Sequence, residues 1–107
     1  MELHWAEGHI TLARPEDFKS FKVVVIGSEH LFAETARDFA DIARFVDRTL
    51  CWVSQAGLRT VAGPAATPAW LASVEAMVAK ARPHGWIDEA TGDIRAHVEW
   101  RERAGQP

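Results

Sequence analysis

The sequence predicts an α+β domain in which two helices pack on one face of an antiparallel sheet of about four strands, with a β-hairpin at the C-terminal end. Near both ends of the chain, apolar residues alternate with polar ones, which is typical of half-buried strands. Between these segments, apolar residues recur every three or four positions, which is typical of amphipathic helices. A length of 107 residues suits one domain, expected over 1–100, followed by a polar tail over 101–107.

The N-terminal segments are predicted strands. Residues 3–5 and 10–12 each show two-residue alternation, and Gly8 lies between them, so we expect a hairpin. Pro15 interrupts the pattern because proline lacks a backbone donor. Residues 21–26 then form an apolar and largely β-branched run, which predicts an internal strand covered on both faces.

The next predicted element is a long helix over residues 29–55. Ser28 is the expected N-cap, and Gly57 is the expected residue just beyond the C-terminal end. An alternative ends the helix near Arg48 and makes 49–54 a strand, because the residues there have high β-propensity. The unbroken apolar phase favours the long helix.

A second helix is predicted from Pro68 to about residue 82. Thr67 offers an N-cap hydroxyl, and proline suits the first helical position. A row of small residues runs along this helix, and a sheet of this kind has exposed edges. Both features lead us to expect self-association as a homodimer. The small residues are Ala69, Ala72, Ala76 and Ala79.

The C-terminal hairpin is predicted to pair residues 85–88 with an amphipathic strand over 93–101. A turn through Gly92 puts Ile87 opposite Ile94, and Trp86 opposite Arg95. We expect this hairpin to lie near an edge of the sheet. The predicted core cluster contains Val24, Ile26, Phe32, Phe39, Ile42, Val46, Leu50, Leu71, Val74, Val78, Ile94 and Val98.

The composition argues against several classes of partner. A net charge of −3, from 12 basic and 15 acidic residues, gives no electrostatic footprint for nucleic acid or an anionic membrane. A single cysteine, Cys51, excludes an internal disulfide framework and favours a reducing compartment. The first residues lack the features of a signal peptide, and no apolar run is long enough to span a membrane. We therefore expect a cytoplasmic protein without membrane partners.

The tryptophans indicate a possible binding surface. The chain has five tryptophans and no tyrosine. Such rings often supply bulk to a small core, but Trp86 and Trp100 flank a polar strand, which indicates a half-exposed aromatic surface. With Arg95, which would hold an anionic group, and His97, they form the predicted ligand-binding set. The leading hypothesis is a non-catalytic binding or accessory module, homodimeric, with a tryptophan-lined surface for an apolar ligand or a protein partner.

An alternative hypothesis is a small cofactor-independent isomerase or lyase. His97 and Glu99 project from the same side of the predicted strand and are the candidate acid–base pair, although alternating charge is also usual on a solvated strand face. The alternation places Trp100 on the opposite face from His97. Both residues can therefore serve one site only if the sheet edge twists or a partner subunit wraps it.

Other candidate sites carry weaker signals. The five histidines do not show the spacing of a zinc site, so no metal and no cofactor are expected. The turn at residues 26–28 has one glycine, too few for a phosphate-binding loop. Cys51 is expected to be a buried thiol rather than a nucleophile. A helix followed by a hairpin is also the order of a winged-helix DNA-binding protein, but this helix carries too little positive charge for phosphate contacts.

Overall fold

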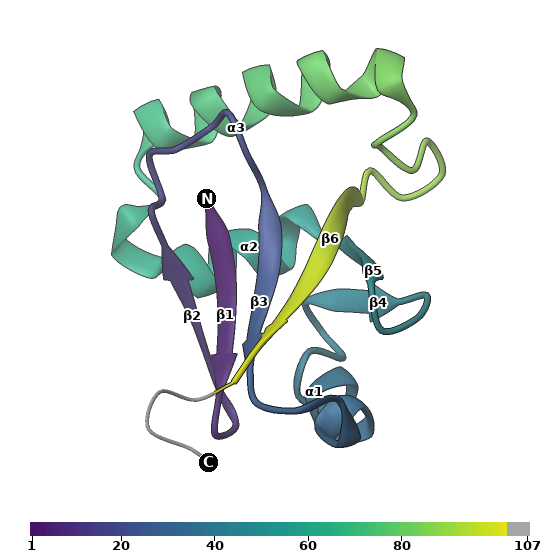
Figure 1. The fold of residues 1–107 in the computed structure, drawn as a ribbon. Coiled ribbons are helices and arrows are strands. Elements are labelled where there is room, and N and C mark those ends of the chain that lie inside the picture. Colours follow the sequence, from purple (N-terminus) through teal and green to yellow (C-terminus); the bar gives the residue numbers. More distant parts are fainter. Residues whose placement is uncertain (103–107) are drawn as a thin grey trace.

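The computed structural model describes residues 1–102, and its centre is a curled, mixed six-stranded sheet with the strand order β2-β1-β3-β6-β5-β4 (Figure 1). The strands are β1 (Glu2–Ala6), β2 (His9–Ala13), β3 (Lys22–Ile26), β4 (Ala43–Phe45), β5 (Leu50–Val53) and β6 (Ile94–Arg101). The helices are α1 (Phe32–Asp38), α2 (Gln55–Ala62) and α3 (Pro68–Ala81). Short 3-10 turns cover Glu29–Leu31, Gly63–Ala65 and Arg82–His84.

The expectation of a four-stranded antiparallel sheet with two helices is wrong. β1, β3 and β6 run parallel to one another, while β2, β5 and β4 add antiparallel pairs at the two sides. Alternation along a strand shows which residues face the core, but it does not show which neighbour the strand pairs with or in which direction. The internal position predicted for residues 23–26 is confirmed, because β3 lies between β1 and β6.

The predicted helix over 29–55 is also wrong. A 3-10 turn leads into α1, which ends at Asp38, and β4 and β5 follow it. Residues 43–45 and 50–53 fit a period of two as well as a helical period, so periodicity alone does not separate the alternatives. Pairing of β5 with β6 selects the strand, because it places Cys51 opposite Ala96 in the core. The alternative strand at 49–54 is therefore the correct one.

Both predicted ends of the long helix differ in the structure. Ser28 makes no capping hydrogen bond, and its hydroxyl instead contacts Nδ1 of His30 at 2.5 Å. Gly57 lies buried inside α2, whose N-cap is Ser54, and the Gly57 N–H donates to the Ser54 hydroxyl at 3.0 Å. The start predicted for α3 is confirmed, since the Thr67 hydroxyl accepts from the Trp70 N–H at 3.1 Å.

The predicted C-terminal hairpin shortens to one bridge. Ile87 pairs with Ile94 in the expected register, and the Arg95 N–H donates to the Trp86 carbonyl at 2.8 Å. β6 is not near an edge, since it lies between β3 and β5. Arg101 is the last residue of β6, and residues 103–107 of the predicted tail lie outside the described part of the chain.

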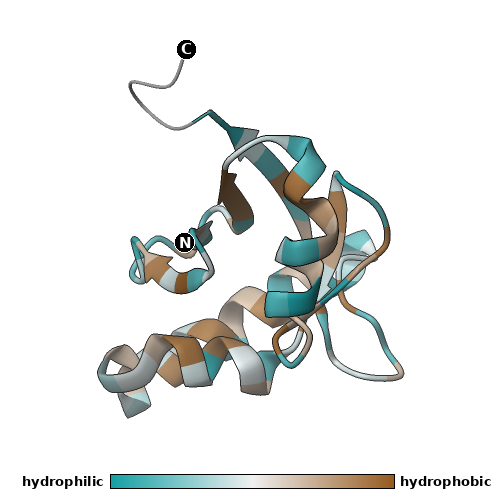
Figure 2. Ribbon diagram, turned by 90° about the horizontal axis from the view of Figure 1, so that it is seen from below, coloured by the Kyte–Doolittle hydropathy of each residue, from teal (hydrophilic) through white to brown (hydrophobic). Residues whose placement is uncertain are grey.

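The core lies on one face of the curled sheet, between the strands and the three helices. Leu3, Val23 and Val98 are opposed across the three parallel strands, and each is at most 2% exposed. Figure 2 shows hydrophobic positions interspersed with hydrophilic ones along the helices, as expected when one side of each helix packs inward. The buried helical residues include Leu58, Trp70, Val74 and Val78.

Most of the predicted core residues are buried or half-buried, with one clear exception. Val46 is 55% exposed, because it belongs to the turn after β4 rather than to a helix face. Val24 is fully buried, but on the sheet face opposite to the main core cluster.

The first prediction compares two residues that the long helix would have buried together. Phe39 is fully buried, and its ring packs edge-to-face against Phe45 with 5.5 Å between the ring centroids. Phe39→Ala should therefore lower the unfolding free energy by about 3–5 kcal/mol. Val46→Ala should change it by less than about 0.5 kcal/mol, because the side chain is exposed. Urea denaturation measures both values. Similar costs for the two variants would contradict the placement of β4.

The second prediction concerns Gly57. In a helix, alanine is ordinarily more stable than glycine by about 1 kcal/mol. A Cβ at Gly57, however, would lie 2.7 Å from the Ile42 Cα atom. Gly57→Ala should therefore lower the unfolding free energy by about 1–3 kcal/mol. The control Ala56→Gly, at an exposed position of the same helix, should show the ordinary glycine cost of about 0.5–1 kcal/mol. Stabilisation by Gly57→Ala would refute the close contact between α2 and the segment before β4.

Candidate ligand-binding cleft

A cleft of about 830 Å³ opens beside the C-terminal half of α3; we call it the α3 cleft. Its walls come from α3, from the loop over residues 18–21, from β5 with the turn before it, and from the start of β6. In Figure 1, α3 lies across the end of the sheet at which β1 and β3 begin. The cleft therefore lies at the amino ends of the parallel strands.

The register of β6 creates the space for the cleft. Lys22, the first residue of β3, pairs with His97, so Ile94–Ala96 extend beyond the start of β3. Residues 86–88 pair with the start of β6 through the single bridge between Ile87 and Ile94. The cleft lining includes Phe21 and Trp86, which lie at the start of β3 and beside this bridge.

Apolar side chains come from every wall of the cleft. The 18–21 loop contributes two phenylalanines, α3 contributes the thioether of Met77, and the two strands contribute Leu50 and Ile94. Phe18, Phe21, Leu50 and Met77 are only partly buried, so the cleft exposes apolar surface to solvent. Contiguous exposed apolar surface of this kind often marks a binding site.

Trp86 lines the cleft and exposes its aromatic ring to solvent. It is 45% exposed, and its ring stacks on His84 with 4.3 Å between centroids. Trp5, Trp70 and Trp100 donate their indole N–H groups to Asp38, Pro15 and Arg48, whereas Trp86 has no such acceptor within residues 1–102. The ring face that is not stacked on His84, and the N–H, remain available to a ligand.

The charged residues of the lining are mainly cationic. Lys19, Lys80 and Arg95 come from the loop, the helix and the strand respectively, and the lining also contains His84 and His97. Asp47 is the one acidic residue in the lining. Its carboxylate accepts from the N–H and the hydroxyl of Thr49, at 2.7 and 2.8 Å. The backbone hydrogen bond from Thr49, with that hydroxyl bond, lowers the pKa of Asp47.

The structure brings three of the four predicted ligand-binding residues together. Trp86, Arg95 and His97 line the α3 cleft. Trp100 does not line the cleft. Its ring centroid lies 6.4 Å from that of Phe32, and its indole N–H donates to the Arg48 carbonyl at 2.7 Å. The alternation that placed Trp100 opposite His97 holds in β6, where Trp100 is beside Val25 on the core side.

Several residues of the cleft were not predicted to belong to a site. Residues 18–20 belong to no predicted element and Phe21 begins a predicted strand, yet Phe18 and Phe21 both form part of the apolar wall. Two phenylalanines within four residues of a loop were the available signal, because a loop rarely exposes such side chains without a partner. Met77 and Lys80 are seen as neighbours of the strand residues only after α3 is placed.

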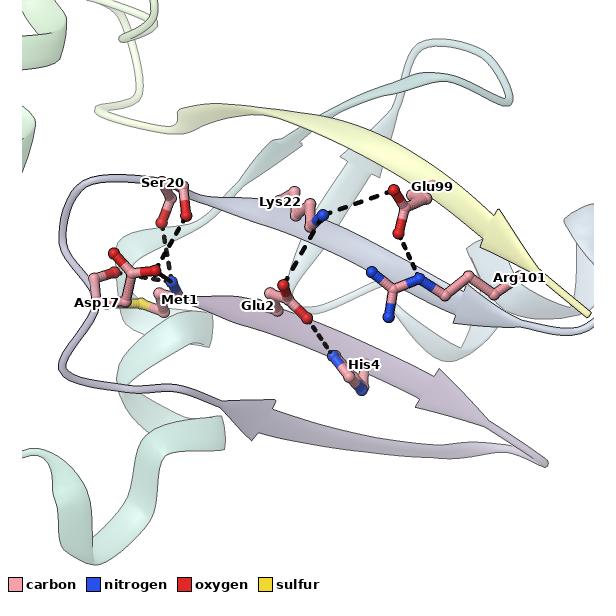
Figure 3. Close-up of polar contacts among 8 residues, drawn as sticks. All are labelled: Met1, Glu2, His4, Asp17, Ser20, Lys22, Glu99 and Arg101. Atoms are coloured by element: carbon pink, nitrogen blue, oxygen red, sulfur yellow. Dashed lines mark hydrogen bonds and ion pairs between the residues drawn. The ribbon is translucent and has the colours of Figure 1, made fainter. Parts of the chain in front are cut away.

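A separate polar network covers the face of the sheet opposite to the core (Figure 3). His4 Nε2 donates to Glu2 Oε1 at 2.7 Å, and Lys22 Nζ lies 3.8 Å from the other oxygen of Glu2. Lys22 also pairs with Glu99 at 3.5 Å, and Arg101 donates to Glu99 at 2.5 Å. These side chains come from β1, β3 and β6, so they tie the parallel strands together on their polar face.

The polar network sets the pKa of Glu99 and engages its carboxylate oxygens. Partial burial raises its pKa, but the hydrogen bond and charge of Arg101, together with Lys22, outweigh this effect and lower the pKa. Glu99 does not line the cleft, and its oxygens contact Arg101 and Lys22. Among residues 1–102, His97 has no carboxylate oxygen within 4.0 Å of its ring nitrogens. His97 therefore lines the cleft without a carboxylate to orient its ring.

The remaining candidates take no part in the cleft. Cys51 lies in β5 rather than in a helix, is fully buried, and burial raises its pKa to about 12, as expected for an unreactive thiol. No three His, Cys, Asp or Glu side chains within residues 1–102 are grouped so that they could hold a metal ion. Over the same residues, no helix has both the length and the apolar character to cross a membrane.

The chain matches no protein-family model, no curated protein and no solved structure. The arguments about function therefore depend on the geometry and chemistry of the cleft itself.

The third prediction concerns Glu2, which is only 8% exposed. The hydrogen bond from His4 and the charge of Lys22 lower its pKa below 4.5, against the raising effect of burial. The lowered pKa contributes stability that is present above pH 4.5 and is lost as the pH falls through the lowered value. The unfolding free energy of the native protein, measured in urea, should fall more steeply below this pH than that of Glu2→Gln.

The control for this comparison is Glu75→Gln, at an exposed position of α3 that has no ion pair within residues 1–102. It should keep the pH dependence of the native protein. If Glu2→Gln also keeps it, the polar network does not hold the charged form of Glu2.

Proposed function

We propose that the protein is a non-catalytic small-molecule binding module whose site is the α3 cleft, and that it acts in the cytoplasm. The observation that carries this proposal is the combination of exposed apolar lining with an accessible tryptophan, Trp86, in one cleft. A volume of about 830 Å³ lies within the range of small-molecule sites, which is about 300–1,000 Å³. The single buried cysteine accords with a reducing compartment.

The cleft geometry favours binding over catalysis. An acid–base reaction needs its two groups within reach of the same substrate atom or of each other. His97 lines the cleft, but Glu99 does not, and Glu99 is engaged by Lys22 and Arg101. The isomerase or lyase hypothesis therefore has one candidate group in the site and lacks the second.

Self-association remains part of the proposal. The alanine row of α3 is exposed over its whole length, and β2 and β4 are the edge strands of the sheet. A close-packed α3–α3 contact or an edge pairing would cover these surfaces in a homodimer. The α3 cleft is formed within one chain, so binding does not depend on this association.

The fourth prediction fills the cleft from α3. Ala81 lines the cleft, whereas Ala76 lies on the exposed side of the same helix. Ala81→Phe should weaken binding of the neutral apolar dye N-phenyl-1-naphthylamine by about tenfold or more, equivalent to about 1.4 kcal/mol, because the new ring occupies the site. Ala76→Phe should leave the affinity unchanged. Dye fluorescence measures the affinity, and the indole N–H resonance of Trp86 reports the location.

Two outcomes of this experiment would contradict the proposal. The first is equal weakening by the two alanine variants, which would place the dye elsewhere. The second is the absence of dye binding to the native protein.

A further inference from the structure

We infer that the ligand of the α3 cleft is an amphipathic organic carboxylate of the fatty-acid type, with its alkyl chain against the apolar wall and its carboxylate on Arg95. This inference rests on the proposed function and adds to it the chemical class of the ligand.

The positive groups of the cleft are free to meet an anion. Within residues 1–102, Lys19, Lys80 and Arg95 have no carboxylate oxygen within 4.0 Å, although the chain as a whole is acidic. By contrast, Lys22 and Arg101, on the polar face of the sheet, are paired with Glu99. Three such cations lining one apolar cleft form a surface that is complementary to an anionic head group.

Arg95 is the best placed of the three cations for a carboxylate. Its backbone is held on both sides, by Trp52 of β5 and by the hydrogen bond to the Trp86 carbonyl, so the base of the side chain is fixed. A guanidinium can donate two parallel hydrogen bonds to a carboxylate, whereas a lysine offers a single point charge. The two lysines, from the loop and from α3, add to the positive potential around it.

The hydroxyl groups of the cleft do not compete for this role. Ser20 donates to Asp17 at 3.3 Å, and Thr49 donates to Asp47 at 2.8 Å. Because a hydroxyl has one proton to donate, both are already committed to carboxylates of the protein. These two hydroxyls therefore leave the head group to the cations of the cleft and to the N–H of Trp86.

The charged groups of the cleft lining are net positive, since Lys19, Lys80 and Arg95 stand against one carboxylate, Asp47. The part of α3 that lines the cleft is its C-terminal half, from Met77 to Ala81, and this end of a helix carries partial negative charge. Asp47 adds a carboxylate at the lining, and its pKa is lowered. Both features reduce the positive charge that a ligand meets, while Arg95 supplies the two parallel N–H donors that match a carboxylate.

The apolar wall indicates the body of the ligand. Phe18, Phe21, Leu50, Met77 and Ile94 come from four different segments of the chain and present mixed aromatic and aliphatic surface. A thioether and rings from different directions fit a flexible alkyl chain, which adapts to an irregular wall. Burial of each methylene contributes to affinity without a directional requirement.

The fifth prediction uses decanoate and decanol, which share one alkyl chain and differ in charge. Both are titrated into the full chain at neutral pH, and binding is followed by backbone and indole NMR shifts. Decanoate should bind about tenfold more tightly than decanol, as expected for a charge-assisted hydrogen bond. Arg95→Gln should remove most of this difference by weakening decanoate alone. Added sodium chloride should weaken decanoate more than decanol.

The matched control is Arg59→Gln. Arg59 is exposed on α2, also has no ion pair within residues 1–102, and does not line the cleft. This variant should bind both probes as the native protein does. Unchanged backbone spectra outside the cleft show that each variant is folded.

The outcomes separate the ligand class from the proposed function. Binding of decanol as tight as that of decanoate, equal effects of Arg95→Gln and Arg59→Gln, or tighter binding of inorganic phosphate than of decanoate would each overturn the carboxylate assignment. If the neutral dye binds in the cleft and decanoate does not, the assignment also fails while the binding function stands. If neither the dye nor decanoate binds there, the proposed function fails as well.

Discussion

The fold and the cleft both depend on the position of β6 between β3 and β5. β6 is parallel to β3 and antiparallel to β5, so it joins the parallel half of the sheet to the antiparallel half. The register with β3 begins at His97, three residues into the strand. The first residues of β6 therefore extend past β3, and the chain around Ile87 pairs with them there through one bridge. A register shift of one residue would move every side chain of β6 to the other face, and would remove its apolar side chains from the core and Arg95 from the cleft.

The alternation along β6 gives the two faces of the sheet different tasks. On one face, Ala96 and Val98 belong to the core, and Trp100 packs against the core and contacts Phe32 of α1. On the other face, Arg95 and His97 line the cleft, while the residues after them enter the charged network. Ile94, at the start of β6, lies on the core face and also lines the cleft, whereas Trp100, six residues further along the same face, does not. This separation removes Trp100 from the ligand-binding set and leaves Trp86 as the tryptophan of the cleft.

The sequence was sufficient for features that depend on local chemistry. The hairpin at Gly8, the N-cap at Thr67 and the bridge between Ile87 and Ile94 follow from turn, cap and pairing preferences, and the structure contains all three. The prediction of a long helix over 29–55 was wrong for a physical reason. Residues 43–53 carry apolar side chains that satisfy two periods at once, and only the partner strand β6 decides between them.

The cleft illustrates the same limit at the level of the site. Arg95, His97 and Trp86 were predictable because they belong to one local pattern around the start of β6. Lys19 and Lys80 were not, because 61 positions separate them in the sequence and only the placement of α3 over the 18–21 loop brings both to the cleft.

The net charge of the chain hides the chemistry of the cleft. Taken over the whole chain, a charge of −3 indicates no anionic partner. The ion pairs show that the charges are unevenly distributed. On the polar face of the sheet, Glu2 and Glu99 pair with Lys22 and Arg101. These acidic residues link the parallel strands through their ion pairs. Within residues 1–102, the cations of the cleft have no such partners. An acidic protein can thus present a locally positive, partly apolar site, and the proposed binding of an amphipathic anion rests on this local imbalance.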